Sequence, residues 1–264
     1  MEPTARREFA HHYSPGKALF QIVVKLKNEP NSLGQVVNML GSRVNLIGTT
    51  TYTVGNDAAI LSAFVEALQP DETAEKLRAL VMSSDTALDT EVSEGRQGIL
   101  VDAFHEGLEM DGDDAMLFRR RALVGMFDQV QSILGSGGEL LLYEEGFAVG
   151  KADAEAFAKT MGPESARRNI GYLRLVLRAR GAGTVEFSEM TEEQSVRIGV
   201  KDCFECSEPR GAKTGCHFFR GLLAGFRKGM FGEDLEVSEL RCRLRGDSWC
   251  EFLMTAERAR GAVA

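Results

Sequence analysis

All five cysteines of this 264-residue chain lie in its last quarter, between residues 203 and 250. They are Cys203, Cys206, Cys216, Cys242 and Cys250. An odd number of thiols in a chain without a recognisable secretion signal argues against a disulfide framework. Thiols gathered so closely along the sequence either share a metal ion or fill one core. Both explanations require the segments that carry them to fold against one another.

The composition bounds the possible classes of protein. Hydrophobic residues make up 44% and charged residues 27% of the chain, which is typical of a globular protein with one large domain or two smaller ones. The net charge of -8 argues against direct nucleic-acid binding, which needs a basic face. Residues 1–17 lack the apolar run of a signal peptide, and no apolar run is long enough to span a membrane. We therefore expect a cytoplasmic protein.

The first third of the chain alternates strand and helix patterns. Apolar, β-branched segments predict four strands, at residues 18–28, 45–54, 58–68 and 86–94. The helical spacing of apolar residues predicts helices over 31–44 and 71–84. The order β-α-β-β-α-β is the split, ferredoxin-like arrangement. We expect an α+β protein in which a flexible leader, residues 1–16, precedes this first domain, residues 17–94.

The loop after the first predicted strand carries a family resemblance. The sequence "NEPNSL" (28–33) places Pro30 and Leu33 as in an ACT domain, a small regulatory module whose loop usually reads Asp-x-Pro-Gly-x-Leu. Asn28 stands where that family has Asp, and Asn31 where it has Gly. The segment therefore resembles an ACT domain. This resemblance implies either an amino-acid site or a packing module without an effector.

Helical patterns dominate the second half of the chain. The predicted helices cover residues 116–134, 138–162, 164–181 and 214–232. Two strands are expected within residues 183–206, and a C-terminal hairpin is expected to turn at Arg245-Gly246-Asp247. These elements predict a second domain, residues 98–256, in which helices pack on an antiparallel sheet. Residues 257–264 are expected to form a frayed tail.

A row of glycines marks one face of the predicted helix 214–232. Gly221, Gly225 and Gly229 recur every four residues. Each interior glycine costs about 1 kcal/mol of helix stability relative to alanine. Such a row is explained by the close approach of another backbone. The expected partner is the sheet of the same domain or a second subunit.

The C-terminal hairpin decides which thiols can converge. Cys242 and Cys250 face each other across the predicted turn. Glu239 and Cys242 would point to opposite faces of a regular strand, so a bulge or a strand end is needed to aim both at one ion. Cys216 begins the glycine-striped helix, where the helix N-terminus favours the thiolate. By local pattern alone, a zinc site would combine the hairpin thiols with the Cys-x-x-Cys pair, Cys203 and Cys206.

Three segments together resemble the 4-vinyl reductase domain, also called the hydrocarbon-binding domain. They are "GELLLYEEGFAVGK" (138–151), "GCHFFRGLLAGFRKGMFG" (215–232) and "ELRCRLRGDSWCEF" (239–252). The most specific pattern is Glu-x-x-Cys, then Gly-Asp, then Cys-x-Phe. The resemblance extends over about residues 98–256. It implies zinc as a cofactor, bound by Cys216, Glu239, Cys242 and Cys250. Four protein ligands leave no open position, which makes the implied zinc structural.

Two further residue types stay open at this point. Cys203 and Cys206 fall outside the implied ligand set, and they could be a redox pair, a second metal site or small core residues. His217 is an alternative to Glu239 as a ligand, or a group beside the metal.

The resemblance also implies an apolar ligand enclosed between the helices and the sheet. Aromatic side chains that could line such a pocket, or could instead fill the core, are Tyr143, Phe147, Phe157, Tyr172 and Phe219. No catalytic constellation, phosphate loop or dinucleotide fingerprint is recognised.

The favoured hypothesis is a regulatory sensor of small molecules. We expect it to form a homodimer and to act on a downstream protein partner. One alternative is a reductase or enzyme accessory in tetrapyrrole-type metabolism, although no site for a hydride donor is found. Another is a dimeric adaptor, since the family's fold resembles subunits of vesicle-tethering complexes.

Overall fold

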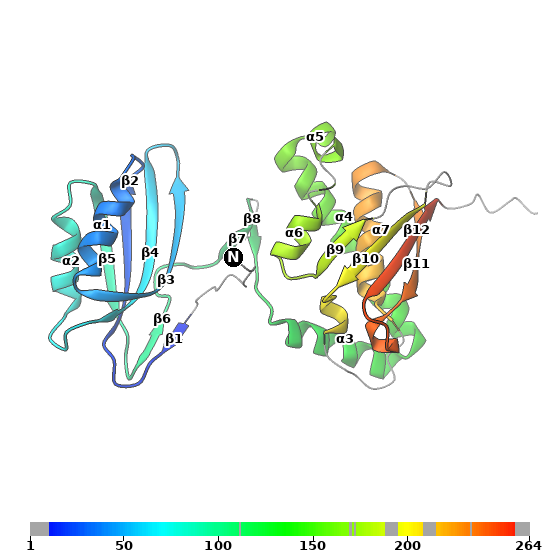
Figure 1. Cartoon of the computed structure of the whole chain (residues 1–264), viewed down its shortest axis with the longest axis horizontal. Coiled ribbons are helices and arrows are strands. Elements are labelled where there is room, and N and C mark those ends of the chain that lie inside the picture. Colours follow the sequence, from blue (N-terminus) through cyan, green and yellow to red (C-terminus); the bar gives the residue numbers. More distant parts are fainter. Residues whose placement is uncertain are drawn as a thin grey trace, which may run out of the picture. The chain divides into compact units, whose positions relative to one another are not determined.

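The computed structural model describes residues 11–110, 112–168, 171, 173–187, 195–207, 215–232 and 234–256. The chain divides into two compact units, residues 1–108 and 109–264 (Figure 1). The first ten residues of the predicted leader and the predicted tail lie outside the described residues. No helix in the described part of the chain has the length and apolar character that crossing a membrane requires.

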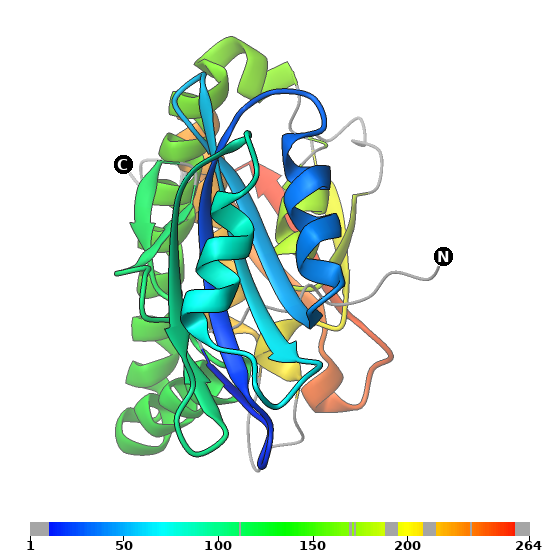
Figure 2. The same cartoon turned by 90° about the vertical axis from the view of Figure 1, so that its left-hand side faces the viewer.

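A four-stranded antiparallel sheet forms the centre of the first unit. Its strands, in the order β3-β4-β2-β5, are β3 (Val44–Val54), β4 (Ala58–Ala67), β2 (Leu19–Lys27) and β5 (Ala87–Glu94). Helices α1 (Ser32–Gly41) and α2 (Ala74–Met82) cover one face of this sheet (Figure 2). The order along the chain is strand-helix-strand-strand-helix-strand, as the sequence predicts.

The core of the first unit lies between this sheet and its helices. It is built from residues that alternate along β2 and from the inner faces of the helices, including Ile22, Val24, Val36, Leu40, Leu77 and Val81. Thr73 caps α2, because its Oγ1 accepts the N–H of Lys76 at 3.3 Å. Apolar periodicity therefore sets both the strands and the helices of this unit.

A second, smaller cluster involves segments that the sequence places elsewhere. Strand β1 (His11–Tyr13), within the predicted flexible leader, pairs with β6 (Ile99–Val101). Leu100 of β6 is buried against Leu19 and Phe64. Residues 98–108, which the sequence assigns to the second domain, thus lie in the first unit. The short strands β7 (Leu108–Met110) and β8 (Asp113–Ala115) pair with each other after this segment.

The second unit combines helices with an antiparallel sheet, as predicted. Its helices are α3 (Arg120–Leu134), α4 (Ser136–Met161), α5 (Pro163–Arg168), α6 (Leu173–Ala179) and α7 (His217–Phe231). Its strands, in the sheet order β11-β12-β10-β9, are β11 (Leu235–Arg241), β12 (Cys250–Ala256), β10 (Val196–Lys201) and β9 (Thr184–Phe187). Gly135 joins α3 to α4, with φ of 56°.

The glycine row of α7 packs against α4, and neither the sheet nor a second subunit is its partner. A Cβ on Gly221 would collide with the carbonyl oxygen of Tyr143, and one on Gly225 with that of Phe147. In return, a Cβ on Gly146 or Gly150 of α4 would collide with carbonyls of α7. The prediction of a close backbone contact is confirmed, but its expected partner is wrong. The two helices lie side by side (Figure 1).

Candidate metal centre

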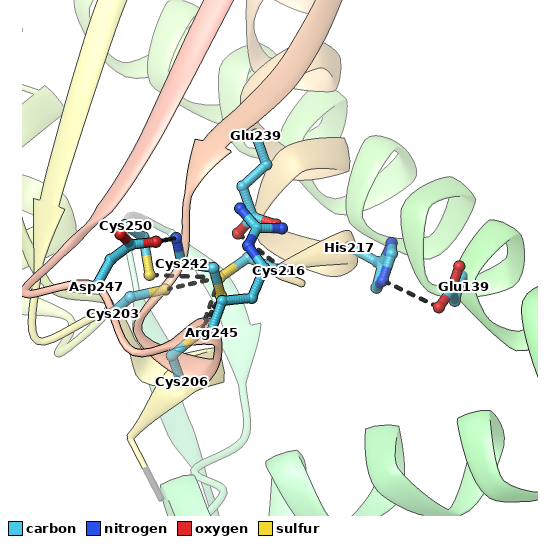
Figure 3. A network of polar contacts seen from close by, with 10 residues as sticks. All are labelled: Glu139, Cys203, Cys206, Cys216, His217, Glu239, Cys242, Arg245, Asp247 and Cys250. Atoms are coloured by element: carbon cyan, nitrogen blue, oxygen red, sulfur yellow. Dashed lines mark hydrogen bonds and ion pairs between the residues drawn. The ribbon is translucent and has the colours of Figure 1, made fainter. Parts of the chain in front are cut away.

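The five cysteines converge on one buried spot of the second unit (Figure 3). All five lie within the described residues and are free thiols. The Sγ atom of Cys216 is 3.8 Å from that of Cys242, 3.6 Å from that of Cys250 and 3.9 Å from that of Cys203. A tetrahedral site with Zn–S bonds of about 2.3 Å places its sulfurs roughly 3.8 Å apart. The spacing of these thiols suits a tetrahedral ion.

Each thiol is positioned by the end of an element. Cys216 is the N-cap residue of α7. Cys242 follows the last residue of β11, and Cys250 is the first residue of β12. Cys203 and Cys206 belong to the turn after β10, where a short 3₁₀ helix spans Phe204–Cys206. Four places in the chain are thereby joined at one point.

A β-bulge aims Glu239 toward the thiols. Glu239 pairs with Phe252 of β12, and Arg241 pairs with the preceding residue, Glu251. Leu240 is therefore the extra residue of the bulge, which lets Glu239 and Cys242 turn to one side despite their odd separation. A ligand oxygen of Glu239 and the sulfurs of Cys216, Cys242 and Cys250 all lie within 4.8 Å of one another. These are the four residues that the 4-vinyl reductase resemblance implies.

The carboxylate of Glu239 also has partners within the protein. Its Oε1 accepts the backbone N–H of Cys216 at 3.1 Å. Its Oε2 pairs with Nη1 of Arg245 at 3.2 Å, and the Glu239 side chain is only 7% exposed. A Cβ on Gly215 would collide with this same carboxylate oxygen, so the preceding loop packs directly on Glu239.

The Gly-Asp pair of the hairpin turn holds Cys242 in place. Oδ2 of Asp247 accepts the N–H of Cys242 at 2.8 Å, and the N–H of Asp247 donates to the carbonyl of Cys242 at 3.3 Å. Gly246 has φ of 97°, a left-handed conformation that glycine adopts readily. The motif therefore orients a metal-binding thiol through its backbone, a role that the sequence alone does not assign.

Glu205 lies between Cys203 and Cys206 and caps α7. Its carboxylate accepts the N–H groups of Phe218 at 3.1 Å and Phe219 at 2.8 Å. Burial raises the pKa of Glu205 to about 8; the two N–H bonds oppose this shift, and the negative charges of Glu239 and Cys250 reinforce it. Sequence reasoning missed this residue, because its helix begins more than ten positions later and no local capping pattern links the two.

The thiols also influence one another's protonation. Hydrogen bonds from Cys203, Cys206 and Cys216 hold the pKa of Cys250 below its usual range. The same contacts raise the pKa of Cys216, beginning with that to Cys203, and burial adds to the effect. The cluster thus stabilises a thiolate at Cys250, and a bound cation would favour deprotonation of the other ligands.

A second group of four thiols overlaps the first. The sulfurs of Cys203, Cys206, Cys216 and Cys250 also lie within 4.8 Å of one another. Cys216 and Cys250 belong to both groups. The combination favoured by local pattern is close as well, since Sγ of Cys206 is 3.5 Å from that of Cys242.

His217 is directed away from the thiols. Its Nε2 is 3.6 Å from Oε1 of Glu139 on α4, and its imidazole points away from the sulfurs in Figure 3. The structure therefore does not bring His217 into either group, and the alternative of His217 as a ligand in place of Glu239 is not supported by its position.

The predicted aromatic residues surround the same core as the thiols. Phe219 is fully buried and stacks on Phe252 with ring centroids 5.5 Å apart. Tyr143, Phe147 and Phe157 are partly buried and pack against this core. Tyr172 lies outside the described residues. The four that the structure describes are therefore grouped around one core in the second unit.

All five cysteines and Glu239 lie within residues 196–256. This segment matches the family of 4-vinyl reductase domains. The resemblance to that domain is thus confirmed for these residues, which run from β10 to β12.

Similar proteins are known from curated sequences and from solved structures. The uncharacterized protein MJ0150 of Methanocaldococcus jannaschii is 27% identical over 124 residues, which cover 47% of this chain and 68% of that protein. The phenol-responsive sensory domain of the transcription activator PoxR, solved with phenol, has a TM-score of 0.44 at 18% identity and covers 55% of this chain and 77% of that chain. A vinyl-4-reductase family protein from M. jannaschii has a TM-score of 0.39 at 20% identity, over 55% of this chain and 85% of that chain.

Proposed function

We propose that this protein is a regulatory sensor of small molecules whose second unit is stabilised by a structural zinc ion. The observation that carries the proposal is the convergence of Cys216, Glu239, Cys242 and Cys250 within a segment that matches the 4-vinyl reductase domain. Buried thiols are soft donors that suit zinc, and a carboxylate oxygen completes a tetrahedral shell. A zinc ion bound there would crosslink α7 to the β11–β12 hairpin and perform no chemistry of its own.

The ligand of the second unit is expected to be small and apolar or aromatic. Its proposed site involves the partly buried rings Tyr143, Phe147 and Phe157, together with Tyr172 and Phe219. The first three support this placement, because they combine contact with the core and access from the surface. The metal centre would hold the start of α7, which carries Phe219, in a fixed position beside this site.

The first unit is proposed to be an ACT-like domain with a ferredoxin-like fold. Its strand-helix order and the sheet order β3-β4-β2-β5 support this assignment. A cavity of about 220 Å³ borders the loop at residues 28–33, and its lining includes Asn28, Ser32 and Tyr52. The buried Oγ of Ser32 has no hydrogen-bond partner among the residues that the structure describes. A small polar effector would satisfy this hydroxyl.

A homodimer is part of the same proposal. Helix α3 leaves large apolar side chains exposed, among them Met126, Ile133 and Leu134, at 55%, 68% and 52%. Burying such side chains between two copies would remove apolar surface from water. The downstream protein partner through which the sensor acts is likewise proposed.

Native mass spectrometry of the purified protein tests these statements together. We expect one zinc ion per chain, a mass of two chains and a co-purified apolar molecule. Chelation should lower the melting temperature of the second unit and leave that of the first unit unchanged, because zinc binding is coupled to folding and the two units have separate cores. Absence of zinc from protein expressed with adequate zinc would overturn the metal proposal, and turnover of an added nicotinamide or flavin donor would overturn the sensor.

A further inference from the structure

We propose that Cys203 and Cys206 are a second pair of metal-binding thiols. With Cys216 and Cys250 they would form an all-thiolate set that replaces Glu239 and Cys242. One ion could then be held by either pair. This inference rests on the proposed metal site and adds two ligands that the 4-vinyl reductase resemblance does not include.

The distances support this second pair directly. Sγ of Cys203 is 3.9 Å and Sγ of Cys206 is 2.8 Å from Sγ of Cys216. All four sulfurs of the set lie within 4.8 Å of one another, which is the same spread as in the group with Glu239. Cys203 is completely buried and Cys206 is 4% exposed. The pair therefore lies as close to the shared thiols as the residues it would replace.

Each pair can leave the metal without stranding a buried charge. When Glu239 is not a ligand, its carboxylate keeps the N–H of Cys216 and the guanidinium of Arg245 as partners. When Cys203 and Cys206 are not ligands, they can be neutral thiols, which behave as small apolar residues in a core. A buried charge without a partner would be strongly destabilising. The protein thus provides for both states.

The geometry favours one ion over two. Two ions bridged by Cys216 and Cys250 would place the two other ligand pairs on opposite sides of the shared edge. Yet Sγ of Cys206 is only 3.5 Å from Sγ of Cys242. This separation is close to the roughly 3.8 Å between sulfurs on a single tetrahedral zinc. The two sets therefore overlap in space and compete for one ion.

Both pairs are connected to the first turn of α7. Glu205, between the two thiols of the second pair, accepts the N–H groups of Phe218 and Phe219. Glu239 accepts the N–H of Cys216, the N-cap residue. A shift of the ion from one pair to the other would thus change how this helix terminus is held. Ligand exchange at the metal is a means of altering α7.

Two reciprocal double variants test the inference, Cys203→Ser/Cys206→Ser and Glu239→Gln/Cys242→Ser. Each is reconstituted with Co(II), and the bound metal and the thiolate-to-cobalt absorption are measured. We expect each variant to bind one ion, with four thiolates in the second and three in the first. A variant that combines all four substitutions should bind none. Glu236→Gln, an exposed carboxylate on the same strand, is the control for Glu239→Gln.

The outcomes separate this inference from the proposed metal site. If Glu239→Gln/Cys242→Ser binds no cobalt while Cys203→Ser/Cys206→Ser binds one ion with an unchanged spectrum, the second pair is disproved and the first set stands. If the unaltered protein binds no metal, both proposals fail. Far-UV circular dichroism checks that each variant is folded. Should a double variant not fold, Glu239→Gln alone decides, because the second pair predicts that it keeps a full complement of metal and loss of the ion contradicts it.

Discussion

Glu205 and Phe219 are 14 residues apart, yet the carboxylate of Glu205 accepts the N–H of Phe219 at 2.8 Å. The same carboxylate accepts the N–H of Phe218. Two of the first N–H groups of α7, which have no partner within the helix, are thereby satisfied in the protein interior. The turn that carries Cys203 and Cys206 and the helix that begins after Cys216 are fixed to each other by this side chain.

Replacing Glu205 with alanine should destabilise the second unit. The substitution leaves two buried N–H groups without acceptors, which costs about 1–3 kcal/mol for each unsatisfied group. Urea denaturation followed by the fluorescence of Trp249, the chain's single tryptophan, measures the loss. Glu186→Ala, whose side chain is 66% exposed, is the matched control and should change stability little. Equal effects of both substitutions would show that the cap contributes nothing.

The sequence predicts the elements around this site better than their contacts. Apolar periodicity places the helices and strands, and the hairpin turn is recognisable from Gly246 and Asp247. The role of Glu205 is not predictable, because it joins segments that only the fold brings together. The bulge at Leu240 could be stated as a requirement but not located, since bulges have no fixed sequence pattern.

The same limit applies to the glycine row. Gly221 and Gly225 indicate that a backbone approaches α7, but their spacing carries no information about which backbone. The partner, α4, bears its own glycines, Gly146 and Gly150, which read in isolation as ordinary interruptions of a helix. Pairing of β1 with β6 was missed for a related reason, because three-residue strands are too short to show an alternating pattern.

Gly225→Ala should disrupt the contact between α4 and α7. The added Cβ would collide with the carbonyl of Phe147, which is backbone and cannot move aside cheaply. Overpacking of this kind costs about 1–3 kcal/mol and occasionally more. Gly125→Ala on α3 is the control, since nothing lies within 4 Å of its Cβ position and alanine favours a helix. Thermal denaturation should show a lower midpoint for the first variant and an equal or higher one for the second.

Asn31 holds the loop before α1 in a left-handed conformation, with φ of 73°. This is the position where ACT domains have glycine. Asn31→Gly should therefore be tolerated, whereas Asn31→Ala should destabilise the first unit by about 1–2 kcal/mol, because a Cβ without a compensating polar group disfavours this conformation. Hydrogen exchange of the amides in β2 and β4 reports on this unit. If alanine is as well tolerated as glycine, the backbone conformation makes no demand on the residue.

Asp102 is the centre of a polar network on the sheet of the first unit. Its Oδ1 accepts Nε2 of the buried Gln21 at 2.7 Å, and its Oδ2 is 2.8 Å from Nδ1 of His105. The backbone N–H groups of Phe104 and His105 donate to Oδ1 as well. Burial raises the pKa of Asp102, but the hydrogen bonds outweigh it and hold the pKa below the ordinary value of 3.8.

This shift predicts a loss of stability in acid. A carboxyl whose pKa is lowered by folding stabilises the native state above its ordinary pKa, and the stabilisation disappears as the pH falls through the lower, folded-state value. Hydrogen exchange of β2 amides should therefore accelerate as the pH is lowered below about 4, after correction for intrinsic rates. Asp102→Asn should be less protected at pH 7 and should lose less on acidification. The exposed Asp89→Asn is the control, and an Asp102 variant with the same acid dependence as the unaltered chain would show that the network does not couple to folding.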